Sequence, residues 1–269
     1  QRAIDSKIGE VYVATADEEI AKVIKDVGGK SILTSKEHKT GSDRIFEAIE
    51  KNFSKKPDNI INLQGDMPNI DPSAIKLLDK FMNNNSYQIA TLATELNSIK
   101  DLENKNIVKI ETKEEMQINN FDNALDFFRL KNINKDNFYY HHVGIYGYQY
   151  ETLKKFISLK RSDNEINRSL EQMRAMDNDI SISVGLTDSY PLGVDTIEDL
   201  EEIRNIIKKK INYKKFIEAV KMLSKSKISV GCFIVIGFPE DNKKTIWQTI
   251  KMIFKLAVLG VDDITVSQF

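Results

Sequence analysis

Short apolar runs alternate with amphipathic stretches along most of this chain, and that alternation limits the folds available to it. Runs typical of strands occupy residues 10–15, 31–34, 60–63, 89–94 and 180–184. Between them, stretches such as 17–27 and 72–82 repeat apolar residues at helical spacing. Strands that alternate with helices usually form a parallel sheet covered by helices. We therefore expect an α/β fold with a mostly parallel, Rossmann-like sheet.

The composition excludes several functional classes. A length of 269 residues allows one large domain or two smaller ones. A net charge of -1 offers no basic field for nucleic acid. No apolar run approaches the ~20 residues that span a bilayer, so we expect no membrane insertion. No signal-peptide pattern precedes the first strand, which predicts a cytoplasmic protein.

The run at 60–63 leads into the stretch that most favours a ligand site, Leu63-Gln64-Gly65-Asp66-Met67-Pro68. Gly65 permits a sharp turn, and Pro68 prevents the strand from continuing. Asp66 then follows the C-terminal end of a strand, where open α/β sheets bind ligands. A carboxylate there suits Mg²⁺, which proteins usually hold with one or two carboxylates plus substrate phosphates. The alternative is an Asp that bonds its own backbone within the turn.

The segment Thr40-Gly41-Ser42-Asp43-Arg44 precedes a predicted helix. Ser42 or Asp43 is the expected N-cap. A helix start rich in hydroxyls and Gly can also hold an anion through its N–H groups. The local sequence favours plain capping over anion binding.

Polar residues in the second half of the chain have local patterns that favour structural roles. His141 and His142 are adjacent in a predicted strand, so they point to opposite faces and cannot form a joint metal site. A structural histidine is the alternative for each. Glu171 and Gln172 lie side by side in a predicted helix at 170–176, which would ordinarily be a solvated face.

The segment Gly193-Val194-Asp195-Thr196 precedes another predicted helix. Thr196 and Asp199 resemble a capping box. The local sequence is therefore compatible with structural roles for Asp195 and Thr196.

Seven motifs, in this order, resemble those of the 3-deoxy-manno-octulosonate cytidylyltransferases, or CMP-Kdo synthetases. The resemblance covers about residues 1–207 and is specific because the motifs recur at family-like spacings. They are Val13-Ala14-Thr15, Thr40-Gly41-Ser42-Asp43-Arg44, Leu63-Gln64-Gly65-Asp66, Ala90-Thr91-Leu92-Ala93, His142-Val143-Gly144-Ile145-Tyr146, Leu170-Glu171-Gln172 and Gly193-Val194-Asp195-Thr196.

The resemblance implies that the anomeric hydroxyl of 3-deoxy-D-manno-octulosonate (Kdo) attacks the α-phosphorus of CTP. Pyrophosphate leaves, and CMP-Kdo is formed for lipopolysaccharide biosynthesis. Phosphoryl transfer of this kind depends mostly on positioning and charge neutralisation. By the same resemblance, Asp66 and Asp195 are catalytic residues that hold Mg²⁺, and the enzyme is a homodimer.

The resemblance also implies two binding regions. Residues facing Kdo would be Gln64, Arg129, His142, Tyr146, Glu171 and Gln172. Arg129 suits the sugar carboxylate because its planar guanidinium can pair with a carboxylate through two hydrogen bonds. Residues facing the nucleotide would be Thr40, Gly41, Ser42 and Arg44, with Ala90, Thr91, Leu92 and Ala93 near the cytosine.

The chain departs from the family pattern in several places. The family opens with a strand and a Pro-Gly-Lys-Pro loop that grips the triphosphate, and the resemblance here begins after both. We therefore expect a sheet that lacks its first strand and an unfilled central sheet position. Each charge-assisted contact is worth roughly 1.5–3 kcal/mol, so losing several would lower the rate by orders of magnitude.

Three further departures lie within the matched region. Met67 stands where the family usually has Glu, Ala16 where it often has Asp, and residues 161–168 lack the usual Ser-Pro-Leu-Glu pattern. Two alternatives therefore stay open. One is a catalytically incompetent fragment that only binds or dimerises, and the other is a cytidylyltransferase for another acidic sugar.

The C-terminal part reads as a separate unit. We expect a cytidylyltransferase-like domain at 1–207, a linker at 208–212 and an αβαβ unit at 213–269. That unit resembles part of a radical S-adenosylmethionine (SAM) barrel, through Gly231, residues 234–240 and residues 245–249. Such barrels hold an iron–sulfur cluster on a Cys-x-x-x-Cys-x-x-Cys segment, which the single Cys232 cannot provide. The same count excludes internal disulfides.

Overall fold

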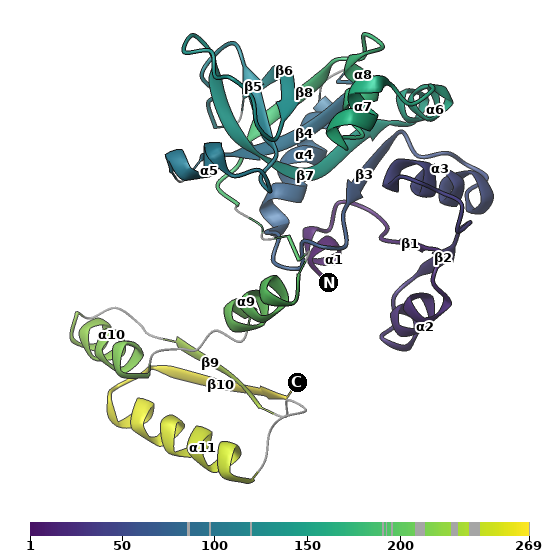
Figure 1. Cartoon of the computed structure of the whole chain (residues 1–269). Helices are drawn as coiled ribbons and strands as arrows, with labels where there is room; N and C mark the ends of the chain where they lie inside the picture. The colour runs from purple at the N-terminus through teal and green to yellow at the C-terminus, as the bar shows by residue number, and fades with distance from the viewer. Residues whose placement is uncertain are drawn as a thin grey trace. The chain divides into compact units, whose positions relative to one another are not determined.

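The computed structural model describes residues 1–84, 87–96, 98–118, 120–189, 191, 193–194, 196–207, 213–226, 231–236 and 243–268. The chain forms two compact units, residues 1–203 and 204–269. The division falls within helix α9 (Ile197–Ile207). The predicted linker at 208–212 lies outside the described residues. Figure 1 shows the course of the chain.

The first unit is built on a six-stranded sheet with the strand order β3-β7-β4-β8-β6-β5. These strands are β3 (Asn59–Leu63), β4 (Ile89–Thr94), β5 (Lys109–Thr112), β6 (Phe121–Phe128), β7 (Phe138–Gln149) and β8 (Ile182–Leu186). The pair β4–β8 is parallel, and the other described pairs are antiparallel. The expectation of a mostly parallel sheet is therefore wrong. The described residues between β5 and β6 and between β6 and β7 form loops without a crossover helix, and such connections favour antiparallel neighbours.

The long strand β7 organises this sheet. It pairs with β3 over residues 145–149, with β4 over 141–148 and with β5 over 138–141. Because β5 returns to β7, the pairing of β7, β4, β8, β6 and β5 closes into a ring.

A separate parallel pair contains β1 (Val13–Thr15) and β2 (Ser31–Leu33). Between them runs α2 (Glu18–Asp26), whose N-cap Asp17 accepts hydrogen bonds from the N–H groups of the first turn. In the larger sheet, β3 is an edge strand. The expected unfilled central position of the sheet stays a prediction.

Helices cover both faces of the large sheet. Successive side chains of β4 point to opposite faces, and because they are mostly apolar on both, each face needs a covering layer. Ile89 and Ala93 pack in a core with α3 (Gly41–Asn52), α6 (Tyr150–Ser158) and α8 (Met173–Met176). Ala90 and Leu92 pack in a second core with α4 (Pro72–Asn84). The remaining helices of this unit are α1 (Arg2–Ser6), α5 (Ile99–Glu103) and α7 (Asp163–Arg168).

Two local predictions are wrong in ways that concern the site. The N-cap of α3 is Thr40, not Ser42 or Asp43, because Thr40 is extended and its side chain accepts from the N–H of Asp43. The helix predicted at 170–176 is shorter than expected, since α8 covers only Met173–Met176 and follows the left-handed C-cap Ser169 of α7, with a φ of 54°. Glu171 and Gln172 therefore lie in the turn before α8, which begins at Met173.

The second unit has the predicted αβαβ order. It contains α10 (Tyr213–Lys225), β9 (Gly231–Ile236), α11 (Lys243–Val258) and β10 (Asp263–Gln268). The strands β9 and β10 are parallel, and Ile217, Val220, Ile234 and Leu256 form the core. Residues 237–240 of the predicted resemblance lie outside the described residues. Among the described helices of both units, none has the length and apolar character that a membrane span requires.

Candidate active site

The start of α3 lies against the loop that follows β3. A Cβ atom on Gly41 would sit 3.2 Å from Nε2 of Gln64, so glycine permits this close approach. Gln64 in turn donates to the side-chain oxygen of Asn62 over 3.3 Å. The structure thus brings Gly41 and Gln64 together from two elements that are separate in sequence.

Aromatic side chains of β7 continue this polar region. Tyr146 lies opposite Asn62 in the sheet. Its ring centroid is 5.4 Å from that of His142 and 5.9 Å from that of Tyr148. The hydroxyl oxygens of Tyr148 and buried Ser42 are 3.3 Å apart, which joins the strand to the first turn of α3.

The turn before α8 completes the cluster. Glu171 lies 3.9 Å from the guanidinium of Arg174, measured from Oε1 to Nη2. Arg174 is itself buried and makes two 2.8 Å hydrogen bonds to the buried carboxylate of Glu165. A second carboxylate, Asp43 on α3, lies 4.0 Å from Arg174. The guanidinium therefore connects α7, α8 and the start of α3.

Three buried polar atoms in this region have no hydrogen-bond partner: the Tyr146 hydroxyl, Oε1 of Glu171 and Nε2 of Gln172. Burial raises the pKa of Glu171, while the side chains of Thr40 and Ser42 act in the opposite direction. Burial, and then the neighbouring Tyr148 and Glu171, hold the pKa of Tyr146 well above its usual value. Buried polar groups are usually paired, so this set is suited to a polar ligand that supplies the missing partners. We refer to Tyr146, Glu171 and Gln172 as the polar cluster.

His142 lies beside the polar cluster as a neutral, half-buried imidazole. Burial and the adjacent His141 lower the pKa of His142 to about 3. Its Nε2 is 3.2 Å from the hydroxyl of Thr91, and the ring of Phe127 meets it edge-on at 5.4 Å. At neutral pH the ring can accept one hydrogen bond and donate another.

Arg129 follows the end of β6 and is exposed. Its Nη1 donates to the backbone carbonyls of Lys105 and Asn106, over 3.4 and 3.1 Å. Arg129 comes two residues after Phe127, whose ring contacts that of His142. The place of Arg129 beside the sugar site stays a prediction.

Asp66 is exposed in the loop after β3. Its backbone carbonyl accepts a 2.9 Å hydrogen bond from the N–H of Val194. Asp195, its predicted partner, lies outside the described residues. Thr196 and Asp199 form the reciprocal bonds of the predicted capping box, at 2.9 and 3.1 Å.

The donor chemistry at Asp66 fits Mg²⁺, because carboxylate oxygen is its preferred protein ligand. The described residues contain no group of three or more His, Cys, Asp or Glu that could hold a metal. Mg²⁺ does not need such a group when substrate phosphates supply the other oxygens.

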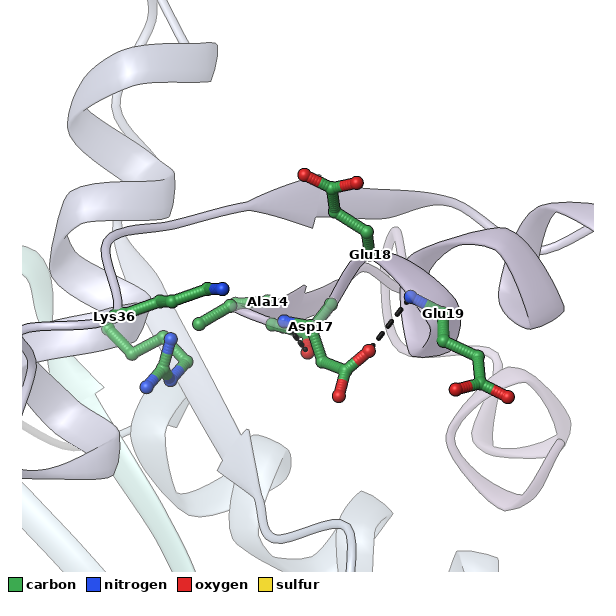
Figure 2. A pocket seen from close by; sticks show the side chains of 8 residues that line it. Ala14, Asp17, Glu18, Glu19 and Lys36 are labelled. Atoms are coloured by element: carbon green, nitrogen blue, oxygen red, sulfur yellow. Dashed lines mark hydrogen bonds between the residues drawn. The ribbon is translucent and has the colours of Figure 1, made fainter.

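A cleft of about 700 Å³ opens beside the strand pair β1–β2. It is lined by Ala14, Thr15, Ala16, Asp17, Glu18, Glu19, Lys36 and Arg44. Figure 2 shows Lys36 on one side of it and Asp17 and Glu19 on the other. Arg44 is held in place because its Nη1 donates to the hydroxyl of Thr34 over 2.7 Å. Two cations therefore border this cleft, of which the sequence motifs indicated only Arg44.

The four residues predicted near the cytosine are in the core of the sheet. Ala90, Thr91, Leu92 and Ala93 each have 0% of their surface exposed. Their predicted role in nucleotide binding stays a prediction.

Sequence reasoning gave no role to Glu165 or Arg174. Their spacing of nine residues across two short helices carries no recognisable pattern, and only burial identifies them as a pair. Full burial of both charged side chains is unusual unless they are paired.

A mixed sheet covered by helices, with an exposed Asp after a strand end and a helix start against the same loop at Gln64, is typical of α/β enzymes that bind phosphorylated ligands. A family model described as Cytidylyltransferase matches residues 1–182. The 3-deoxy-manno-octulosonate cytidylyltransferase of Thermodesulfovibrio yellowstonii is 42% identical over 211 residues, which cover 75% of this chain and 83% of the relative. The chain therefore belongs to the cytidylyltransferase family, as the motifs predicted.

Other relatives agree. The protein of the same name from Bartonella tribocorum is 39% identical over 208 residues, covering 77% of this chain and 85% of the relative. A solved structure of CMP:2-keto-3-deoxy-manno-octonic acid synthetase complexed with CTP matches with a TM-score of 0.67 and 32% identity. That match covers 78% of this chain and 86% of the other.

A second family model, the Radical SAM superfamily, matches residues 170–253. It supports part of the resemblance predicted for 213–269. Cys232 of β9 is half-buried, and burial raises the pKa of its thiol, which disfavours the thiolate needed to bind iron.

Proposed function

We propose that this chain transfers CMP from CTP to the anomeric hydroxyl of Kdo, releasing pyrophosphate and forming CMP-Kdo for lipopolysaccharide biosynthesis. Membership of the cytidylyltransferase family and the names of its relatives support this reaction. The observation that carries the sugar part of the proposal is the polar cluster, in which three buried atoms have no hydrogen-bond partner. A polyhydroxylated sugar acid supplies both donors and acceptors to such atoms.

The sugar acid would be recognised by Gln64, Arg129, His142, Tyr146, Glu171 and Gln172. Arg129 uses only Nη1 for its two backbone contacts. The guanidinium has five donors in all, so an edge stays available for the sugar carboxylate. Glu171 would accept from sugar hydroxyls, and the Gln172 amide would donate to them.

The nucleotide would lie toward the start of α3 and the cleft beside β1. N–H groups at a helix start favour anions such as phosphate. Thr40, Gly41, Ser42 and Arg44 come from this segment, and Lys36 adds a second cation at the cleft.

Mg²⁺ would be held by Asp66 and Asp195. When bound, it would neutralise phosphate charge during the displacement. The hydrogen bond from Val194 to the carbonyl of Asp66 supports this pairing, because it joins the two segments that carry the carboxylates. The oxygen–phosphorus bond to the sugar forms as the bond to pyrophosphate breaks, and positioning of the two reactants supplies much of the rate.

The test is an assay of the purified chain with CTP, Kdo and Mg²⁺, in which pyrophosphate and CMP-Kdo are both measured. Asp66→Ala should abolish Kdo-dependent pyrophosphate release. Asp136→Ala, which removes another exposed carboxylate from the turn before β7, should leave it unchanged. Equal release by Asp66→Ala and the unaltered chain would overturn the proposed role of Asp66.

Absence of any Kdo-dependent release would call for the same assay with the N-terminal segment of a curated relative fused ahead of Gln1. Activity only in the fusion would show that the site needs that segment. Inactivity in both would favour a fragment that only binds. A panel of acidic sugars in the active form decides which sugar acid is used, and light scattering tests the predicted homodimer.

A further inference from the structure

The strand β7 carries an irregularity beside the polar cluster. Thr91 of β4 lies opposite Tyr146 of β7, but the next residue, Leu92, lies opposite Val143. One step along β4 therefore corresponds to three steps along β7. Two extra residues, Gly144 and Ile145, form a β-bulge at this point.

The bulge changes the distance between two predicted site residues. His142 and Tyr146 are four residues apart, which would separate them by roughly 13 Å in a regular strand. Their ring centroids are 5.4 Å apart. Because the bulge inserts an even number of residues, both side chains stay on the same face of the sheet. The irregularity thus places an imidazole directly beside a phenol.

The hydroxyl of Thr91 connects both ends of the bulge. Its oxygen is 2.7 Å from the carbonyl oxygen of Ile145 and 3.2 Å from that of Val143. The same oxygen is 3.2 Å from Nε2 of His142. Thr91 is fully buried, so water does not compete for these contacts.

The proton count decides the direction of each bond. Both carbonyls can only accept, and the hydroxyl has one hydrogen, which goes to the nearer carbonyl of Ile145. The contact with His142 is then satisfied when Nε2 carries a hydrogen and donates to the oxygen of Thr91. This arrangement leaves Nδ1 as the acceptor of the neutral ring.

We propose that Thr91 is a positioning residue for the sugar acid, whose hydroxyl secures the β7 bulge and holds His142 as the Nε2–H tautomer. His142 and Tyr146 then offer an acceptor and a hydroxyl side by side. The role of these two residues in sugar binding rests on the proposed function. The geometry of Thr91 rests on the described contacts alone.

The test uses Thr91→Val, which keeps the shape of the side chain and removes the hydroxyl. Thr91→Ser restores the hydroxyl, and Thr94→Val is the control because it removes a buried hydroxyl from the same strand outside the bulge. ¹⁵N NMR of the histidine rings reports the His142 tautomer without any substrate. The KM values for Kdo and for CTP are measured separately.

In the unaltered chain and in Thr91→Ser and Thr94→Val, His142 should be the Nε2–H tautomer. Thr91→Val should populate the other tautomer and raise the KM for Kdo about 3- to 10-fold, the factor expected for one buried hydrogen bond. The KM for CTP should change less than about twofold, because Thr91 has no exposed surface for direct contact with the cytosine; a larger change would favour the nucleotide-binding role predicted for Thr91 by resemblance. An unaltered chain with His142 in the Nδ1–H form would overturn the proposal even if Thr91→Val folds poorly.

The proposal would also be overturned if Thr91→Val kept both the His142 tautomer and the KM for Kdo of the unaltered chain. The NMR arm also separates this proposal from the proposed function. A chain that shows the expected tautomers but never uses Kdo would contradict the proposed function and the role of Thr91 in positioning His142 for the sugar acid. It would leave only the structural role of Thr91 at the bulge.

Discussion

The backbone N–H of Val194 donates to the carbonyl oxygen of Asp66 over 2.9 Å. This bond joins the loop after β3 to the segment that leads into α9, although the two are far apart in sequence. It involves the neighbour of Asp195 and the backbone of Asp66. The two segments that carry the predicted magnesium ligands are therefore held together by a backbone hydrogen bond, which involves neither carboxylate.

Asp195→Asn should impair turnover far more than folding. Loss of a charge positioned at the reacting phosphate should lower kcat by about 10²-fold or more, while the melting temperature should stay within about 2 °C. Thr196→Ala is the matched control, because it removes the capping hydroxyl that bonds the N–H of Asp199. It should lower stability by about 1 kcal/mol and retain turnover. If Asp195→Asn lowers the melting temperature as Thr196→Ala does, without a larger loss of rate, Asp195 is mainly a structural residue.

Tyr146→Phe and Tyr148→Phe should differ in their effect on stability. The Tyr146 hydroxyl is buried without a partner, so its removal should raise the free energy of unfolding or leave it unchanged. The Tyr148 hydroxyl meets Ser42 at 3.3 Å, so its removal should cost about 1 kcal/mol. Urea denaturation of both variants gives the comparison. A loss of stability in Tyr146→Phe equal to that in Tyr148→Phe would mean that the Tyr146 hydroxyl has a partner in solution.

His142 should make the protein sensitive to mild acid. The ring has an ordinary pKa of 6.5 and a folded-state pKa of about 3. Above pH 6.5 it is neutral in both states and contributes no pH dependence. As the pH falls from 6.5 toward 3, the unfolded chain takes up the proton first, so stability is lost at up to about 1.4 kcal/mol per pH unit.

His142→Gln should lack this part of the slope. The measurement is urea denaturation of both proteins at pH 7, 6 and 5, with the difference in unfolding free energy plotted against pH. Parallel curves for the two proteins would show that His142 titrates in the folded state near its ordinary pKa.

Glu165→Gln should be among the most destabilising single changes in the first unit. It would replace the charged two-bond partner of the buried Arg174 guanidinium with a neutral amide, and the remaining carboxylates, Glu171 and Asp43, lie beyond hydrogen-bond distance at 3.9 and 4.0 Å. Loss of one partner of a buried ion pair typically costs about 3–5 kcal/mol. Arg174→Met should cost less, because Glu165 keeps its 2.8 Å contact with Arg161. Chemical denaturation of both variants checks the order. A cost below about 0.5 kcal/mol for Glu165→Gln would mean that the pair behaves like a solvated surface ion pair.

Local sequence was sufficient for most helices and strands. The helix predicted at 17–27 is α2 at Glu18–Asp26, and the run at 60–63 lies in β3 at Asn59–Leu63. These elements follow from apolar periodicity and from capping residues, which act within a few positions along the chain. The predicted strand direction was wrong for most of the sheet, because the antiparallel placement of β7 between β3 and β4 depends on pairing between distant segments.

Glu171 and Gln172 show the same contrast between local sequence and tertiary structure within the candidate site. Their local pattern indicated a solvated helical face, whereas the structure places them in a turn, with Gln172 and Oε1 of Glu171 buried. The left-handed Ser169 and the buried Arg174 decide this, and neither has a periodic signature. Only the resemblance of whole motifs to a known family predicts that the two residues belong to a site.

By itself, the sequence determined the family, the residue types of the candidate site and the positions of most elements, because these depend on short motifs and local periodicity. The tertiary structure decided the mixed sheet, the β7 bulge that brings His142 beside Tyr146, and the burial of Glu165 with Arg174. These features arise where segments remote in sequence compete for the same hydrogen bonds and the same buried space, and no local pattern records that competition.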